Sequence, residues 1–281
     1  MTINNPENKL TKKELAESLG VSRSSLYYTR KRPKIDAFIK YQIESVMSKH
    51  RSYGHKRIAM ELKYNKKRIL RVMKKFNLKP YRRRTIKPVK PDDLGKPQSQ
   101  YQNLIKDFCP IRPNVVWVSD FTFIEFGDGF IYLATIMDLF SREITGWNIS
   151  KHHDTGLVLG ALLDALEKVG SCPIYLHSDQ GSEYESNRYT DECKRNRITI
   201  SMSKKSSPWE NGFQESFYSN FKLDLGHVDQ FEALGELTEA IHLAINYYNR
   251  DRIHTSLKTS PAQFRERYYQ NIKFKSCRQS V

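Results

Sequence analysis

The sequence of 281 residues lacks the long apolar stretches typical of membrane and secreted proteins. Its most apolar run, residues 130–140 (FIYLATIMDLF), is shorter than the roughly 18 residues of a spanning helix and is more typical of a β-strand. The first ten residues, MTINNPENKL, have no apolar core of a signal peptide. We therefore expect a cytoplasmic protein with no membrane partner.

Cysteine is scarce and scattered. The four cysteines, at positions 109, 172, 193 and 277, form no Cys-x-x-Cys pair and have no histidines at a zinc-ligand spacing. This arrangement argues against both a disulfide framework and a zinc site.

Positive charge is abundant and unevenly distributed. Basic residues outnumber acidic ones, 47 to 31, which gives a formal net charge of +16 and an isoelectric point near 9.6. The first 100 residues hold 27 basic and 8 acidic side chains, whereas residues 101–281 hold 20 and 23. Neutralising nucleic-acid phosphates with release of counterions is the simplest use of such a block. We therefore expect an amino-terminal region that binds DNA; a membrane-surface role is the weaker alternative.

Three acidic residues lie in distinctive local settings. Asp120 is inside the run WVSDFTFI, Asp179 follows a strand-like run in HSDQGSEY, and Glu215 lies within ENGFQESFYSNFK. A carboxylate among apolar neighbours is costly unless it is paired or binds metal, and Gly181 would let a strand end abruptly beside Asp179. Carboxylate oxygens suit Mg²⁺, and two ions about 3.5–4 Å apart can hold both the attacking and the leaving oxygen of a phosphodiester. The set therefore predicts a two-metal polynucleotidyl transferase.

The segment around Glu215 has the periodicity of a helix. Large apolar side chains recur every four residues and predict a stripe that packs onto a sheet: Phe213, Phe217, Phe221 and Leu225. Another face would carry a ligand, polar neighbours and a cation: Asn211, Glu215, Ser219 and Lys222. An ordinary amphipathic helix is the alternative, but the two strand acids favour the catalytic interpretation.

Five motifs in order resemble the transposases of bacterial insertion-sequence family three, whose catalytic core is similar to retroviral integrase. They are Pro113-Asn114 followed by WVSDFTFI, then MDLFSREITGW at 137–147, HSDQGSEY at 177–184, SMSKKSSPWENGFQESF at 201–217 and YNRDRIHTSLKTSPAQF at 248–264. Two positions depart from the family pattern, since Glu210 stands where Asp is more frequent and Ser206 where Gly is common. Glu210 is therefore a rival to Glu215 as the third ligand.

The resemblance implies that Asp120, Asp179 and Glu215 are the catalytic and metal-binding triad, with two Mg²⁺ or Mn²⁺ ions. It implies binding of inverted-repeat ends and target DNA, cleavage that exposes a 3′-hydroxyl, and strand transfer. A homo-oligomer on DNA, a bacterial cytoplasmic location at the nucleoid and an upstream-frame helix-turn-helix partner protein follow from the same resemblance. Two alternatives remain open: a ribonuclease-H-type nuclease without strand transfer, and a binding-only regulator derived from a transposase.

Residues 1–33 resemble a helix-turn-helix, in place of the His/Cys zinc module of retroviral integrases. Thr11 can cap one helix, Gly20 marks a turn and Ser22 can cap a second helix. The predicted core is Leu15, Ala16, Leu19, Val21 and Leu26. The second helix, residues 22–28, would be the recognition helix, with Arg23, Ser24 and Tyr28 as candidate DNA contacts.

Residues 34–80 resemble a second helical DNA-binding element that precedes the core in the same family. Its apolar positions are compatible with two packed helices: Ile58, Leu62, Ile69, Val72 and Met73. Residues 81–105 are a basic linker that contains proline. Candidate DNA contacts in these two segments are Arg57, Lys67, Arg68, Arg71, Arg82, Arg83 and Arg84.

Residues 106–225 have an α/β pattern. Strand-like runs at 115–126, 130–140, 143–150, 173–178 and 197–201 alternate with helices at 154–169, 186–196 and around Glu215. This ribonuclease-H-like order predicts a mixed five-stranded sheet with Asp120 on its central strand, beside Asp179.

Residues 226–281 form a predicted carboxyl-terminal helical extension. One helix would run from about 230 to 249, with Asp229 and Glu232 as its capping box. His254 is an acid–base candidate, although metal ions activate water in this mechanism, so a structural or phosphate-contacting role is favoured. The remaining candidate DNA contacts are Lys204, Lys205, Asn211, Lys222, Arg252 and His254.

Overall fold

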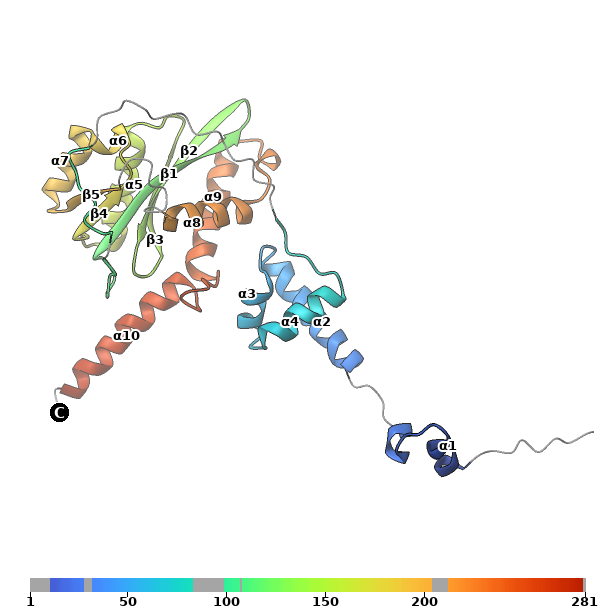
Figure 1. The fold of residues 1–281 in the computed structure, drawn as a ribbon. Coiled ribbons are helices and arrows are strands. Elements are labelled where there is room, and N and C mark those ends of the chain that lie inside the picture. Colours follow the sequence, from blue (N-terminus) through green and yellow to red (C-terminus); the bar gives the residue numbers. More distant parts are fainter. Residues whose placement is uncertain (1–10, 28–31, 83–98, 107, 204–211, 280–281) are drawn as a thin grey trace, which may run out of the picture.

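The computed structural model of the chain describes residues 11–27, 32–82, 99–106, 108–203 and 212–279. Its centre is a five-stranded sheet in the order β3-β2-β1-β4-β5 (Figure 1). The strands are β1 (Val116–Phe126), β2 (Gly129–Asp138), β3 (Ile144–Ser150), β4 (Tyr175–Ser178) and β5 (Thr199–Met202). The β1–β2 and β2–β3 pairs are antiparallel, whereas β1–β4 and β4–β5 are parallel. The predicted mixed sheet with the first strand at its centre is therefore confirmed.

Helices cover both faces of this sheet because side chains alternate across its strands. On β2, Ala134 and Ile136 belong to a core that includes α5 (Thr155–Val169) and α7 (Asn187–Arg195). Leu133 and Met137 belong to a second core, which includes α8 (Gly212–Leu225) and α9 (Leu234–Arg250). The fold is thus a ribonuclease-H-like α/β layer structure.

Close packing of α5 on the sheet depends on one glycine. A Cβ atom at Gly146 on β3 would lie 2.4 Å from the backbone nitrogen of Ala165. Asp154 caps the start of α5, and Gly170 ends it in the left-handed conformation. The predicted bounds of this helix are correct to within one residue.

The structure differs from the prediction in two additional helices and in the capping of α9. The four-residue α6 (Ser182–Glu185) and the long α10 (Pro261–Gln279) were not individually predicted. The predicted capping box is wrong, because Asp229 lies in the 3-10 turn η3 (Val228–Gln230) and α9 begins later. The carboxylate of Glu236 accepts hydrogen bonds there from the backbone of Glu232 at 2.9 Å and Ala233 at 3.4 Å.

The helix-turn-helix predicted at the amino terminus is not confirmed in the described residues, although this region is helical. Helix α1 (Lys12–Ser18) has the predicted start, with a capping box between Thr11 and Glu14, and Gly20 has a φ of +63°. The second segment is a five-residue 3-10 helix, η1 (Arg23–Tyr27), rather than an α-helix. The predicted apolar core is wrong: Ala16 is buried, whereas Leu15, Leu19 and Val21 are exposed. The hydroxyl of Ser22 bonds Ser24 and Ser25 instead of capping a helix.

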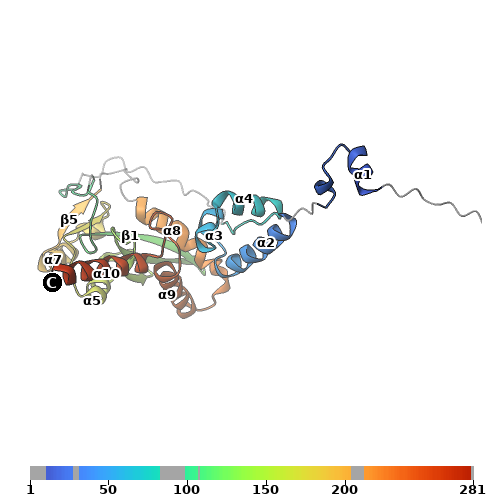
Figure 2. The ribbon, with the colours of Figure 1, turned by 90° about the horizontal axis from the view of Figure 1, so that it is seen from below.

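The second helical element is a three-helix unit with its own core. It comprises α2 (Arg32–Lys49), α3 (His55–Glu61) and α4 (Lys66–Lys75), which lie together beside α8 in Figure 2. The two predicted helices are confirmed as α3 and α4. Helix α2 was not predicted, although Ile39, Ile43 and Val46 recur at helical spacing and are buried. Within the described ranges, no helix combines the length and apolar character needed to cross a membrane.

Candidate active site

The parallel pairing of β1 and β4 brings Asp120 and Asp179 to the same end of the sheet. Val118 of β1 pairs with His177 of β4 in this ladder. Asp120 follows two residues after Val118 within β1, and Asp179 follows two residues after His177, just beyond the end of β4. Helix α8 contributes Glu215 from the face of the sheet that it covers. The predicted set is therefore supplied by two adjacent strands and one helix.

The electrostatics of Asp120 show that these acids are neighbours. Burial raises the pKa of Asp120 well above its usual range, and the charges of Asp179, Glu215 and Glu183 raise it further. One interaction opposes this increase in pKa: the Asp120 Oδ1 atom accepts a hydrogen bond of 2.8 Å from the backbone of Phe121. The site is a cluster of like charges whose ionisation is mutually unfavourable.

Two buried polar side chains fix α8 against the strands, and sequence reasoning missed both. The Gln214 side chain donates to the Val118 carbonyl at 2.7 Å and accepts from the Thr135 hydroxyl at 3.2 Å. The Tyr218 hydroxyl donates to the Asp120 carbonyl at 2.6 Å. Their separation of four residues, on the helix face next to Glu215, was the available signal.

A fourth carboxylate, Glu183 on α6, was also missed. Its side chain is 9% exposed, and its spacing of four residues after Asp179 was the available signal. A Cβ atom at Gly181 would lie 2.4 Å from the Glu183 Oε1 atom. Gly181 therefore leaves room for a carboxylate, in addition to donating its backbone N–H to the Asp179 Oδ1 atom at 3.1 Å.

The donor set fits a hard divalent cation. Asp120, Asp179, Glu215 and Glu183 offer oxygen ligands, which suit Mg²⁺ and Mn²⁺ rather than zinc. A bound cation would also relieve the repulsion that raises the pKa of Asp120. The described carboxylate, imidazole and thiol groups nevertheless do not form a closed three-ligand cluster.

Helix α8 follows its predicted pattern with one exception. Phe217, Phe221 and Leu225 are buried, whereas Phe213 is 46% exposed. Glu215 and Ser219 are exposed, as expected for the face away from the core. The Lys222 ammonium lies 4.7 Å from the centre of the Phe123 ring.

The predicted DNA contacts have different environments. Arg23, Ser24, Lys67 and Arg68 have exposed side chains. The Arg71 guanidinium donates two hydrogen bonds, of 2.8 and 2.6 Å, to the buried carboxylate of Asp36 on α2. The Lys75 ammonium donates to the same carboxylate at 2.8 Å. These cations hold the pKa of Asp36 well below its usual range. Several residues lie outside the described ranges: Tyr28, Arg83, Arg84, Lys204, Lys205, Glu210 and Asn211.

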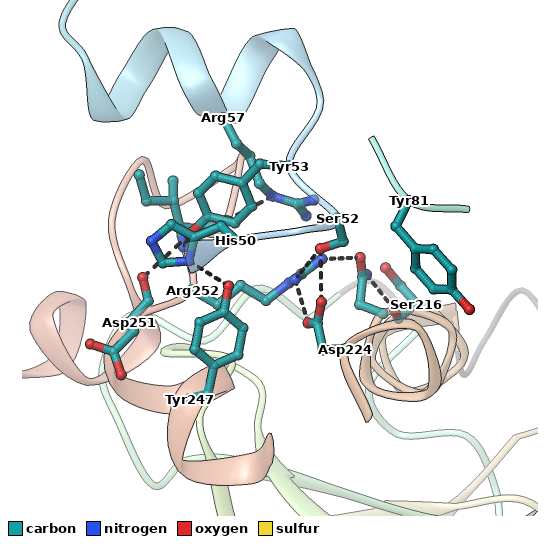
Figure 3. Close-up of polar contacts among 12 residues, drawn as sticks. His50, Ser52, Tyr53, Arg57, Tyr81, Ser216, Asp224, Tyr247, Asp251 and Arg252 are labelled. Atoms are coloured by element: carbon teal, nitrogen blue, oxygen red, sulfur yellow. Dashed lines mark hydrogen bonds and ion pairs between the residues drawn. The ribbon is translucent and has the colours of Figure 1, made fainter. Parts of the chain in front are cut away.

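Arg252 has a structural environment that the sequence did not indicate. It is 2% exposed and lies where the loop after α9 meets the loop between α2 and α3 (Figure 3). Its guanidinium pairs with Asp224 of α8 and donates to Ser52 at 2.9 Å and to Asn220 at 2.6 Å. These partners within the protein occupy much of the guanidinium's hydrogen-bonding capacity. We call this contact, formed by Ser52, Tyr53, Asn220, Asp224 and Arg252, the seam.

Aromatic side chains extend the seam. The Tyr53 hydroxyl accepts a hydrogen bond of 2.7 Å from the backbone of Ile253. His50 stacks on Tyr53 with ring centres 4.4 Å apart, and its Nδ1 atom lies 2.6 Å from the Tyr247 hydroxyl. The seam therefore joins the three-helix unit to the catalytic core through buried polar contacts.

Three further predicted contacts lie around the seam. Arg57 donates its Nε proton to the Ile253 carbonyl at 2.9 Å, and Arg82 donates to the Ser52 carbonyl at 3.2 Å. Burial and the nearby arginines lower the pKa of His254 to about 4. His254 is therefore neutral at pH 7.

Comparison with known proteins identifies the family. Two models described as "Integrase core domain" match residues 110–208 and 196–261. The chain is 30% identical over 272 residues to the putative transposase InsK of insertion sequence IS150 from Escherichia coli, covering 91% of this chain and 94% of that protein. It is 30% identical over 270 residues to the transposase InsF of IS3A from the same organism, covering 90% and 93%.

Other similarities cover mainly the core. The transposase of IS904 from Lactococcus lactis is 39% identical over 170 residues, which are 59% of this chain and 67% of that protein. The HTLV-2 integrase catalytic core domain, solved in complex with magnesium, aligns with 55% of this chain and 98% of its own, at 20% identity and a TM-score of 0.48. The two full-length similarities decide the matter: the chain is a polynucleotidyl transferase of the IS3 family of insertion-sequence transposases.

Proposed function

We propose that this transposase binds the inverted-repeat ends of its element, cleaves one strand to expose a 3′-hydroxyl, and joins that hydroxyl to a phosphodiester of target DNA. The observation that carries the proposal is the crowding of Asp179, Glu215 and Glu183 around Asp120, which raises the pKa of Asp120. Such a cluster of acids, on β1, just beyond β4 and on the helices α6 and α8, is suited to divalent metal ions and not to proton transfer alone.

Asp120, Asp179 and Glu215 would hold two Mg²⁺ or Mn²⁺ ions, which when bound activate the attacking oxygen and stabilise the leaving one. The chain itself holds the ligands in place. Gln214 and Tyr218 tie α8, and with it Glu215, to the backbone of β1. The backbone N–H of Gly181 orients the carboxylate of Asp179. The three-helix unit, with exposed Lys67 and Arg68, would bind duplex DNA.

Single substitutions test the assignment. Asp120→Asn, Asp179→Asn and Glu215→Gln should each abolish cleavage and joining while leaving binding to the element's ends largely intact, because the carboxylates bind metal and other parts hold DNA. The measurement is a gel assay of cleaved and joined products, alongside a filter or fluorescence assay of end binding.

Two control variants sharpen this test. Glu185→Gln changes an exposed acid of α6 and should retain activity. Retained activity in Glu215→Gln, together with loss in Glu210→Gln, would show that Glu215 is not the third ligand. Cleavage without any joined product in the wild-type protein would favour a nuclease over a transposase.

A further inference from the structure

A cavity of about 380 Å³ opens beside the seam, between the three-helix unit and the catalytic core. Its walls come from α3, from the turn after β2, from the start of α8 and from residues 252–256. Arg57, Arg142, Arg252 and His254 line it, together with the hydroxyls of Thr255 and Ser256. Figure 3 shows Arg57 beside Tyr53, and Arg252 at the centre of the seam.

The charges around this cavity do not balance. Arg252 is paired with Asp224, but Arg57 and Arg142 make no ion pair with a carboxylate in the described part of the chain. The Arg142 Nη1 atom and the His254 Nδ1 atom are both buried and without a hydrogen-bond partner among described residues. The residues that line the cavity include no acidic side chain.

Buried cations are unfavourable when nearby acids compensate them only in part. Burial lowers the pKa of Arg57 and of Arg142, since each charged guanidinium loses contact with water, and the charges of Asp224 near Arg57 and Asp138 near Arg142 offset this only partly. A buried charge without a full counter-charge destabilises the folded protein unless a bound anion compensates for it. An anion in the cavity would compensate both guanidinium charges and accept a hydrogen bond from the unpaired Arg142 Nη1 atom.

The chemistry of the lining favours an oxyanion with several acceptor oxygens. Guanidinium groups bind phosphate through paired N–H donors, and the hydroxyls of Thr255 and Ser256 can donate to the same group. The cavity also adjoins Gly212 and Phe213 at the start of α8, the helix that carries Glu215. A phosphate bound here would therefore belong to DNA close to the catalytic carboxylates.

We propose that this cavity binds a backbone phosphate of the DNA substrate, away from the phosphodiester that is cleaved. The proposal rests on the proposed function of the chain as a DNA transposase. Because Arg57 comes from the three-helix unit and Arg142 from the core, one phosphate would contact both parts. The cavity would thus align a DNA strand that is held by the helical unit with the active site.

The test uses full-length protein and the Arg142→Gln variant. Arg142 has a φ of +64°, and glutamine retains a similar unbranched side chain, so the backbone cost of the turn is unchanged. The measurement is the affinity for duplex DNA over a range of salt concentrations. Loss of one phosphate contact should reduce the slope of log affinity against log salt by about 0.9. Arg188→Gln, at an exposed arginine of α7, is the matched control and should keep the wild-type slope.

A second arm separates DNA phosphate from free phosphate. The melting temperature of the DNA-free protein is compared in inorganic phosphate and in chloride at equal ionic strength, for the wild type and both variants. Stabilisation by phosphate that is lost only in Arg142→Gln, together with the reduced DNA slope, supports the proposal. Stabilisation without a change of DNA slope means a free-phosphate site and overturns it, as does an unchanged result in both arms.

Folding and the proposed function are controlled separately. If Arg142→Gln is unfolded, Arg142→Lys keeps the charge but loses the paired donors, and an unchanged DNA slope and phosphate response in that variant would also overturn the proposal. Cleavage and joining by the wild-type protein are measured in parallel. Their absence would contradict the proposed function, whereas normal activity with unchanged Arg142→Gln binding contradicts only the phosphate pocket.

Discussion

At the scale of single residues, the fold alters the ionisation of Asp120. Burial and the charges of Asp179, Glu215 and Glu183 raise the pKa of its carboxyl well above the usual range. In the folded protein the raised pKa means that the charged form is disfavoured relative to the unfolded chain. As the pH rises from the unfolded pKa of about 3.9 toward the raised folded pKa, ionisation of Asp120 therefore lowers the free energy of unfolding.

The first residue-scale prediction follows from that sign. Without metal, Asp120→Asn should melt at a higher temperature than the wild type at pH 7, because a neutral amide does not repel Asp179. The difference between the two proteins should shrink as the pH falls toward about 4, where the wild-type carboxyl approaches its neutral form in both states. Calorimetry at several pH values measures both effects.

Divalent metal should affect the melting temperatures of the two proteins differently. Mg²⁺ should raise the melting temperature of the wild type more than that of Asp120→Asn, because binding to the folded state alone stabilises it. An equal increase in both proteins would show that Asp120 is not a ligand. Ca²⁺, which has less demanding geometry, should support DNA assembly but little or no cleavage.

At the scale of elements, α8 is shared between three tasks. It carries Glu215, it is fixed to the sheet through Gln214 and Tyr218, and its last turns contribute Asn220 and Asp224 to the seam. The helix that carries Glu215, the proposed third ligand, is therefore also the helix that the three-helix unit contacts. The position of the three-helix unit and the position of Glu215 are mechanically connected.

The element-scale prediction concerns Asp224→Asn. This change leaves the guanidinium of Arg252 buried without its counter-charge, which should cost about 3–5 kcal/mol of unfolding free energy. Cleavage should fall more than DNA binding, because the exposed cations of α4 remain while the contact that joins the three-helix unit to α8 is weakened. Denaturant unfolding and the paired binding and cleavage assays measure these effects.

The matched control is Asp191→Asn, which removes an exposed carboxylate 3.2 Å from Lys194. A solvated pair of this kind should contribute only about 0–1 kcal/mol. Equal losses of stability in Asp191→Asn and Asp224→Asn would mean that the seam does not hold the two parts together.

At the scale of the whole molecule, charge and chemistry are segregated along the chain. The first 100 residues carry most of the positive charge, and the three proposed catalytic acids lie in the later, more neutral part. The seam links Ser52 to Arg252, so a cut near residue 100 would open a buried polar contact. The roles of the two parts are therefore best separated by substitution in the intact chain.

The whole-molecule prediction uses paired charge removal. Lys67→Gln with Arg68→Gln, both exposed on α4, should reduce the salt slope of DNA binding by about 1.8, since each phosphate contact contributes about 0.9. Lys151→Gln with Arg188→Gln removes the same charge from exposed positions of the core and should leave the slope nearly unchanged. Equal slopes for the two double variants would show that the basic amino-terminal region is not the main DNA-holding surface.

The sequence by itself was sufficient for the core. The strands around Asp120 and the helix 154–169 have periodic apolar patterns and clear turn residues, so their order predicted the mixed sheet and its central strand. Motifs with local spacing also predicted the three acids that the fold brings toward one site. These features depend on interactions between residues that are near in sequence or on one strand pair, and such interactions leave a periodic signal.

Only the tertiary structure decided which polar residues are buried and which partners they contact. Arg252 and Asp224 have ordinary polar contexts in sequence, yet they meet in a buried pair because α8, α9 and the loop before α3 converge. Gln214 and Tyr218 are buried because α8 packs on β1 and β2. Glu183 is buried on α6, which follows β4. The opposite error occurred in the predicted helix-turn-helix, where apolar residues predicted to be buried are exposed. Leu19 and Val21 have no partner segment that buries them within the described residues. Burial depends on which distant segments pack together, and hydrophobic periodicity along one segment contains no information about that.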